Sequence, residues 1–236
     1  MSAPPAVDAQ GICRRYGRRW ALVDVSLQVP AGRVALVTGR NGSGKSTLLR
    51  ILSTAIRPDR GTARVAGFDV RRQPAGVRRQ ISLLSHYAYH YEALTALENL
   101  GVAARFVGLP AGREALLPRL ASLGLADRAD DPVSTFSAGM RKRLSLARAL
   151  LRDSSVVMLD EPYGQLDPPG FRLVDRLLGE LRERGVTVLV ATHLIERGAG
   201  LADLGFVLEA GRLVWGGAAA ELPSRARLDP DGEGGH

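Results

Sequence analysis

A glycine-rich segment, residues 39–47, reads Gly-Arg-Asn-Gly-Ser-Gly-Lys-Ser-Thr and constrains the fold more than any other part of the chain. It fits Gly-x-x-x-x-Gly-Lys-[Ser/Thr], the phosphate loop of nucleotide-binding proteins. Its glycines permit positive φ, so successive backbone N–H groups can point inward at phosphate oxygens. An apolar run at 34–37 precedes the loop and a helical pattern follows it, which places the phosphates at a helix N-terminus. The segment therefore predicts a strand–loop–helix unit that binds a nucleotide.

Individual positions of this loop carry expected roles. Lys45 is expected to reach the β- and γ-phosphates, and the Ser46 hydroxyl to ligate Mg²⁺. The nucleotide-binding residues predicted from the loop are Gly39, Arg40, Asn41, Gly42, Ser43, Gly44, Lys45, Ser46 and Thr47.

Two carboxylates follow a second buried-strand run. Residues 156–159 read Val-Val-Met-Leu and are followed by Asp160 and Glu161. At such a strand end Asp160 can hold Mg²⁺ opposite Ser46, and Glu161 can orient or deprotonate the water that attacks the γ-phosphate. The alternative is that two acids cap a strand in solvent.

His193 follows the next apolar strand, residues 188–192. A single histidine after a strand is often a packing or turn residue. At the carboxyl end of a parallel strand beside the phosphate-loop strand, however, it would face the nucleotide crevice and could bond the γ-phosphate. We expect Glu161, His193 and Lys45 to be the catalytic residues.

The composition limits the class of protein. The 236 residues can bury one full core, and a single cysteine, Cys13, fits a reducing cytoplasm. No uninterrupted apolar run is long enough to span a membrane, and the N-terminus lacks the pattern of a secretory signal. The formal charge of +8 comes mostly from scattered arginines without interleaved aromatics. We expect no nucleic-acid partner, while attraction to an anionic membrane surface or an acidic partner stays open.

Strands and helices alternate along most of the chain, which predicts an α/β fold with a mostly parallel sheet. From about 95 to 151 the pattern is helical, and Thr95 with Glu98 forms a capping box. This stretch predicts an inserted α-helical subdomain. The domain is expected to span 5–222, and the charged, glycine-rich segment 223–236 is expected to be a disordered tail.

Residues 136–140, Phe-Ser-Ala-Gly-Met, precede a further predicted helix at 141–151. Small residues at a helix N-terminus suit anion binding, because unpaired N–H groups and the helix dipole face the ligand. Alone the signal is weak, since Ser137 could be an ordinary N-cap.

The order of these motifs resembles the ATP-binding subunits of ABC transporters over roughly residues 5–220. The further motifs of this resemblance are Leu-Asp-Glu-Pro at 159–162, Leu-Asp at 166–167 and Thr-His at 192–193. The resemblance implies a P-loop NTPase of the ABC ATPase type, with antiparallel N-terminal strands and Mg²⁺ with ATP as cofactor. It also implies integral membrane permease subunits as partners, with this chain bound peripherally at the cytoplasmic face of the bacterial inner membrane.

The resemblance further implies an ATP-dependent head-to-tail homodimer. In such a dimer ATP lies between one subunit's phosphate loop and the other's signature, here Phe136, Ser137, Ala138, Gly139 and Met140. Tyr16 would stack on adenine, although a core aromatic is the alternative, and Asp167 would line the dimer interface.

The sequence departs from the family pattern at three places. Three of the five signature residues differ from the usual Leu-Ser-Gly-Gly-Gln, Gly164-Gln165 replaces the usual small residues, and His86 stands where a glutamine normally joins Mg²⁺ to the transporter contact. His86 is therefore a candidate metal ligand, and with Tyr87 a candidate coupling residue. Aromatic and histidine residues gather at 86–91, which suggests a partner surface or a locally packed loop.

Several motifs look most like the haem exporter ATPase of bacterial cytochrome c maturation: Ser85-His86, the run 94–100, Phe-Ser-x-Gly-Met at 136–140 and Glu-Pro-Tyr at 161–163. Haem export is the subclass we expect. The alternatives are an ABC-2-type exporter ATPase for a drug, lipid or polysaccharide, and a soluble ABC ATPase that serves as an assembly scaffold.

Overall fold

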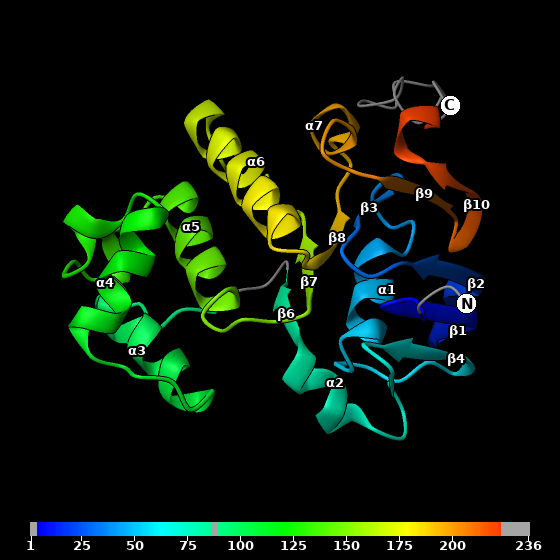
Figure 1. The fold of residues 1–236 in the computed structure, drawn as a ribbon, viewed down its shortest axis with the longest axis horizontal. Helices are drawn as coiled ribbons and strands as arrows, with labels where there is room; N and C mark the ends of the chain where they lie inside the picture. Colours follow the sequence, from blue (N-terminus) through cyan, green and yellow to red (C-terminus); the bar gives the residue numbers. More distant parts are fainter. Residues whose placement is uncertain (1–3, 86–88, 223–236) are drawn as a thin grey trace.

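The structure, a computed structural model, describes residues 4–85 and 89–222. Its strands form two sheets, and Figure 1 shows them at one side of the molecule with a group of helices standing at the other. The smaller sheet is antiparallel in the order β2-β1-β4-β5. Its strands are β1 (Val7–Tyr16), β2 (Arg19–Val29), β4 (Arg60–Val65) and β5 (Phe68–Asp69).

The larger sheet has six strands in the order β10-β9-β3-β8-β7-β6. The five strands from β9 to β6 run parallel, and β10 pairs antiparallel to β9. These strands are β3 (Val34–Thr38), β6 (Ile81–Leu84), β7 (Val156–Asp160), β8 (Thr187–Ala191), β9 (Leu204–Glu209) and β10 (Arg212–Ala218). All residues of β3, β7 and β8 are buried, as continuous apolar runs predict for parallel strands covered on both faces.

Helix α1 (Lys45–Leu52) lies between the two sheets. Its buried residues, among them Leu48 and Leu52, share one hydrophobic core with β1, β2 and β4 on one side and with β3, β7 and β8 on the other. This packing fixes the start of α1 against both sheets, so the phosphate loop that precedes it is held from two directions.

A second core joins the opposite face of the parallel sheet to the remaining large helices. These are α3 (Ala96–Phe106), α4 (Arg113–Ser122), α5 (Ala138–Ala149) and α6 (Pro168–Glu183), with short helices α2 (Pro74–Gln80) and α7 (Ile195–Ala199) elsewhere and 3₁₀ turns at Ala126–Arg128, Val133–Thr135 and Ala219–Glu221. Helices α3 to α5 lie together (Figure 1), and α5 also contacts β6 at the edge of the larger sheet. They occupy the stretch for which the sequence predicts a helical insertion.

The predicted mixed α/β architecture is confirmed, with corrections at element ends. The capping box is present, since Thr95 accepts from the Glu98 backbone and the Glu98 carboxylate accepts from the Thr95 N–H. The helix predicted at 141–151 is instead α5, which begins three residues earlier because Ser137 caps it. His86, Tyr87 and the tail 223–236 lie outside the described residues.

Candidate functional site

The phosphate loop adopts backbone conformations that residues other than glycine rarely adopt. Gly39 has φ of 143° and Gly44 has φ of 108°. A Cβ on Gly39 would lie 2.0 Å from the Leu208 carbonyl oxygen, and one on Gly44 would lie 2.6 Å from that of Ala21. The loop is therefore packed directly on β9 and on β2, and glycine is required at both positions.

Lys45 is the first residue of α1 and lies beneath this loop, with 6% of its surface exposed. Its Nζ donates to the carbonyl oxygens of Gly39 at 2.6 Å and Arg40 at 3.1 Å. Burial lowers the pKa of Lys45, while the nearby Glu161 and Asp160 carboxylates oppose this shift. The loop thus curls around the Lys45 side chain, and two neighbouring carboxylates favour its charged form, which phosphate binding uses.

The residues predicted to hold Mg²⁺ meet in space. Ser46 Oγ donates to Asp160 Oδ1 at 3.0 Å, and Asp160 is buried at the end of β7. A hydroxyl and a carboxylate are oxygen ligands that Mg²⁺ accepts, and no cluster of three or more His, Cys, Asp or Glu residues suited to a metal occurs among the described residues. A site with so few protein ligands fits a Mg²⁺ ion whose remaining coordination positions would be taken by nucleotide phosphates and water.

Ser43 provides a further test of the fit to phosphate. Its Oγ is buried and has no hydrogen-bond partner within 4–85 and 89–222. Buried hydroxyls normally find a partner. Ser43 lines the same cavity as Gly39 to Gly42, where a phosphate oxygen could supply an acceptor.

Glu161 is held in one orientation by the end of the neighbouring strand. Thr192 Oγ1 donates to its Oε2 at 2.9 Å, the His193 backbone N–H donates to its Oε1 at 3.2 Å, and His193 Nδ1 lies 3.1 Å from that same oxygen. The parallel pairing of β7 with β8 brings these residues together, since Asp160 lies opposite Ala191. Glu161 also has φ of 47°, an uncommon conformation that concentrates at functional sites.

Two cavities lie along the phosphate loop. The first, of about 260 Å³, is lined by residues of the loop and by Glu161. The second, of about 620 Å³, lies on the side of His193 and β9 and is lined by Arg19 and residues 38–43 as well. The structure therefore brings Lys45, Ser46, Asp160, Glu161 and His193 to one site.

The remaining predicted site residues lie outside these cavities. Tyr16 ends β1 with 42% exposure, and the Arg14 guanidinium lies over its ring at 5.0 Å. Asp167 caps α6 by accepting from the Gly170 N–H at 2.9 Å, and it lies 3.8 Å from Arg143. Tyr16 is thus available to a base, while Asp167 is exposed beside the helix that carries the signature.

The signature residues 136–140 line neither cavity. Phe136 is buried in the core and anchors the segment, whereas Ser137 and Ala138 are exposed. Ser137 Oγ accepts from the Met140 N–H at 3.2 Å, so it is the N-cap of α5. The start of α5 is therefore exposed and does not contribute to the two cavities of its own chain.

Three residues near the site were not assigned to it from sequence. Thr192 bonds Glu161, Arg19 lies beside Gly42, and Lys142 lies near Asp160 and Glu161. Burial lowers the pKa of Lys142, and the two carboxylates oppose this shift. Thr192 had a sequence signal, because it ends the predicted strand and directly precedes His193. Arg19 and Lys142 belong to no motif, so no sequence signal indicates their position near the site.

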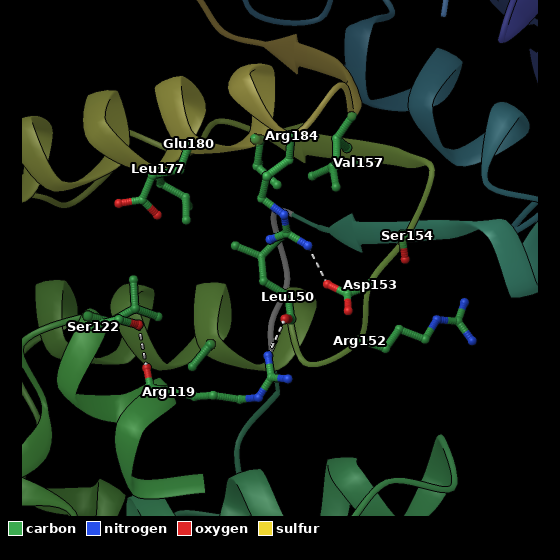
Figure 2. A pocket seen from close by; sticks show the side chains of 14 residues that line it. Arg119, Ser122, Leu150, Arg152, Asp153, Ser154, Val157, Leu177, Glu180 and Arg184 are labelled. Carbon is green, nitrogen blue, oxygen red and sulfur yellow. Dashed lines mark hydrogen bonds and ion pairs between the residues drawn. The ribbon is translucent and has the colours of Figure 1, made fainter. Parts of the chain in front are cut away.

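A third hollow, of about 160 Å³, lies between α4, α5, α6 and β7 (Figure 2). Its arginines are already bound to protein: Arg119 donates to the Leu150 carbonyl at 3.1 Å, and Arg184 forms an ion pair with Asp153. These contacts brace the helices against β7, and we assign no ligand to this hollow.

Comparison with known proteins agrees with this geometry. Residues 22–164 match the ABC transporter family. The daunorubicin/doxorubicin resistance ATP-binding protein DrrA of Streptomyces peucetius is 38% identical over 221 residues, which cover 93% of this chain and 67% of the relative. The Nod factor export ATP-binding protein I of Burkholderia orbicola is 35% identical over 224 residues, 94% of this chain and 73% of the relative.

Among solved structures, the fold is similar to the dimeric post-hydrolysis state of the ATP-binding cassette MJ0796 bound to ADP and Pi. The TM-score is 0.83 at 26% identity, over 90% of this chain and 98% of that one. The chain therefore belongs to the ABC transporter family as an ATP-binding subunit, an ATPase whose hydrolysis of ATP is coupled to transport. The predicted ABC ATPase fold is confirmed.

These relatives do not support the expected subclass. Their names concern drug resistance and Nod factor export, not haem export or cytochrome c maturation. They favour the alternative of an ABC-2-type exporter. The motifs that suggested haem export are ones that the sequence assigns to ATP binding or coupling, roles common to the family, so they report little about cargo.

Proposed function

We propose that the chain powers an ABC-2-type exporter whose cargo is an amphiphilic organic molecule of the drug or lipid class. The observation that carries this proposal is the 38% identity to a daunorubicin/doxorubicin resistance ATP-binding protein across 93% of the chain. The Nod factor export relative supports the same direction of transport for a different cargo.

We further propose integral permease subunits as partners. No helix within the described residues is both long and apolar enough to span a bilayer. A cavity of about 430 Å³ lies between β6, α3 and α5, and Phe106 and Tyr89 beside it are 84% and 83% exposed. Exposed aromatics beside a hollow support binding of an apolar segment from a permease, which would hold the chain at the cytoplasmic face of the membrane.

The proposed cycle assigns one task to each residue of the site. Two copies bind ATP head to tail, with the phosphate loop of one copy and Ser137 and Gly139 of the other on opposite sides of the nucleotide. Bound Mg²⁺ would neutralise phosphate charge, held by Ser46 and Asp160. Glu161, oriented by Thr192 and His193, positions the attacking water. Tyr16 stacks on the base, and Asp167 lies at the seam between the copies.

Export is tested by expressing the chain with its permease subunits in cells loaded with a fluorescent anthracycline. We expect lower dye accumulation than in cells that carry Glu161→Gln, because export needs hydrolysis. Equal accumulation with an active ATPase would reject this cargo class. A loss of covalently haem-bearing cytochromes after deletion of the chain would instead favour haem export.

A soluble assembly scaffold is separated from an exporter by fractionation. After crosslinking in intact cells, we expect the chain in the membrane fraction together with an integral subunit. A chain recovered only in the soluble fraction, with no integral partner, would reject the transporter assignment for this chain.

A further inference from the structure

Arg19, the first residue of β2, lies next to the phosphate loop although it is twenty or more positions away in sequence. A terminal nitrogen of its guanidinium lies 3.9 Å from the position that a Cβ on Gly42 would take. In the β1–β2 pairing Arg19 is directly opposite Tyr16. The end of this hairpin therefore presents an aromatic ring and a cation together beside the loop.

The position of Gly42 connects Arg19 to the phosphates. Gly42 and Asn41 line the cavity that contains Arg19 and His193, and they also line the cavity that contains Lys45 and Ser46. Asn41 and Gly42 are thus common to both cavities, and a polyphosphate that extends from one cavity into the other would pass Gly42. Its path therefore lies within reach of the Arg19 side chain.

The Arg19 guanidinium is also available. It has no hydrogen bond, ion pair or ring contact with another residue of the described ranges, whereas Arg14 and Arg15 of the same hairpin lie over the rings of Tyr16 and Trp20. Guanidinium offers five N–H donors, stays charged and matches phosphate oxygens in geometry. Among the residues that line its cavity the one carboxylate is Glu209.

We propose that Arg19 is a phosphate-binding residue that donates to the terminal phosphates of ATP held on the loop of the same chain, and so favours ATP over ADP. The inference rests on the ATP site described above and adds a contact from the N-terminal hairpin. Because the contact is electrostatic and exposed, its contribution falls as salt rises.

The test compares Arg19→Ala with Arg18→Ala, measuring equilibrium binding of Mg-ATP, Mg-ADP and AMP to the purified chain. Arg18 is an exposed arginine in the adjacent turn and lines neither cavity, so it controls for net charge. We expect Arg19→Ala to raise the Kd of ATP about tenfold, the loss of one charge-assisted contact. The loss should be smaller for ADP and absent for AMP, and Arg19→Lys should restore part of it.

Equal losses for all three nucleotides would indicate a structural role of the hairpin and overturn the inference. Equal effects of Arg18→Ala and Arg19→Ala would indicate long-range attraction and also overturn it. Unchanged ATP binding by Arg19→Ala, with binding abolished in Lys45→Ala, would overturn the inference while leaving the nucleotide site intact. Failure of the unaltered chain to bind ATP would reject both.

Discussion

Ser46 Oγ donates a hydrogen bond to Asp160 Oδ1 at 3.0 Å, although the two residues are 114 positions apart. Ser46 belongs to the first turn of α1 and Asp160 ends β7, and both elements pack in the core between the sheets. Their contact therefore joins the phosphate loop to the strand that carries Glu161. A cation bound here would be fixed relative to Glu161, the residue that we propose positions the attacking water.

Replacing Glu161 by Gln should separate binding from hydrolysis. The amide keeps the size of the side chain but cannot accept a proton, so we expect the ATPase rate to fall at least about 100-fold. The Kd for Mg-ATP should stay within about twofold, since the phosphate-loop contacts remain. Steady-state turnover and equilibrium binding measure the two effects, and turnover equal to that of the unaltered chain would exclude this role.

Thr192 should act on the rate through Glu161. It is fully buried, and its hydroxyl both donates to Glu161 Oε2 and accepts from the Leu194 N–H. Thr192→Val keeps the shape but removes the hydroxyl, so we expect kcat to fall about tenfold with little change in ATP affinity.

Thr192→Ser is the matched control, because it restores the hydroxyl and should recover most of kcat. If the valine and serine variants lose activity equally, packing rather than orientation of Glu161 would explain the loss. If neither loses activity, Thr192 does not position the carboxylate.

The sequence predicts most of the phosphate site because each part is local. The loop, the strand before it and the helix after it are contiguous, and parallel strands end at one edge of a sheet, so Asp160, Glu161 and His193 converge. The predicted capping box at Thr95 is likewise local. What depends on nearby residues could be inferred without knowing the packing.

Other features depend on long-range placement. Arg19 reaches Gly42 because α1 draws the antiparallel sheet against the loop, and neither residue type nor spacing encodes that approach. Strand β10 was not predicted, since its Gly216 and Gly217 weaken the strand pattern. The early start of α5 is a local exception, because the sequence allows Ser137 as an N-cap but the small residues after it carry no helical periodicity.

Tyr163 should contribute to stability through its hydroxyl. The side chain is 1% exposed, and its Oη donates to Asp175 Oδ1 at 2.8 Å. Burial and this carboxylate raise the pKa of Tyr163, so the donor stays protonated. Tyr163→Phe leaves the Asp175 carboxylate without this partner, and we expect a loss of about 1–3 kcal/mol in the free energy of unfolding.

Urea denaturation of Tyr163→Phe, Asp175→Ala and the double variant measures the free energy of unfolding for a double-mutant cycle. Losses that simply add would show that the two side chains are not coupled, contrary to the hydrogen bond.

His90 should make stability depend on pH. Its Nε2 lies 2.9 Å from Ser145 Oγ and 3.1 Å from the Arg141 carbonyl oxygen, both on α5. Burial lowers the pKa of His90 from its ordinary 6.5, and so do Arg148 and Arg141, while the Arg141 carbonyl and Glu92 oppose this. The neutral ring is therefore the form that holds residues 89–92 on the helix that begins at the signature.

The direction of this pH dependence follows from which state, folded or unfolded, takes up the proton first. Above the unfolded pKa of 6.5 the ring is neutral in both states, and the folded chain keeps the full stabilisation. As pH falls, the unfolded chain takes up the proton first, so the free energy of unfolding decreases until the pH passes the lowered folded pKa. His90→Gln can still bond Ser145 but does not titrate, so its stability should fall less between about pH 7.5 and 5. Urea midpoints measured across this range compare the two proteins, and parallel curves would show that protonation of His90 is not linked to folding.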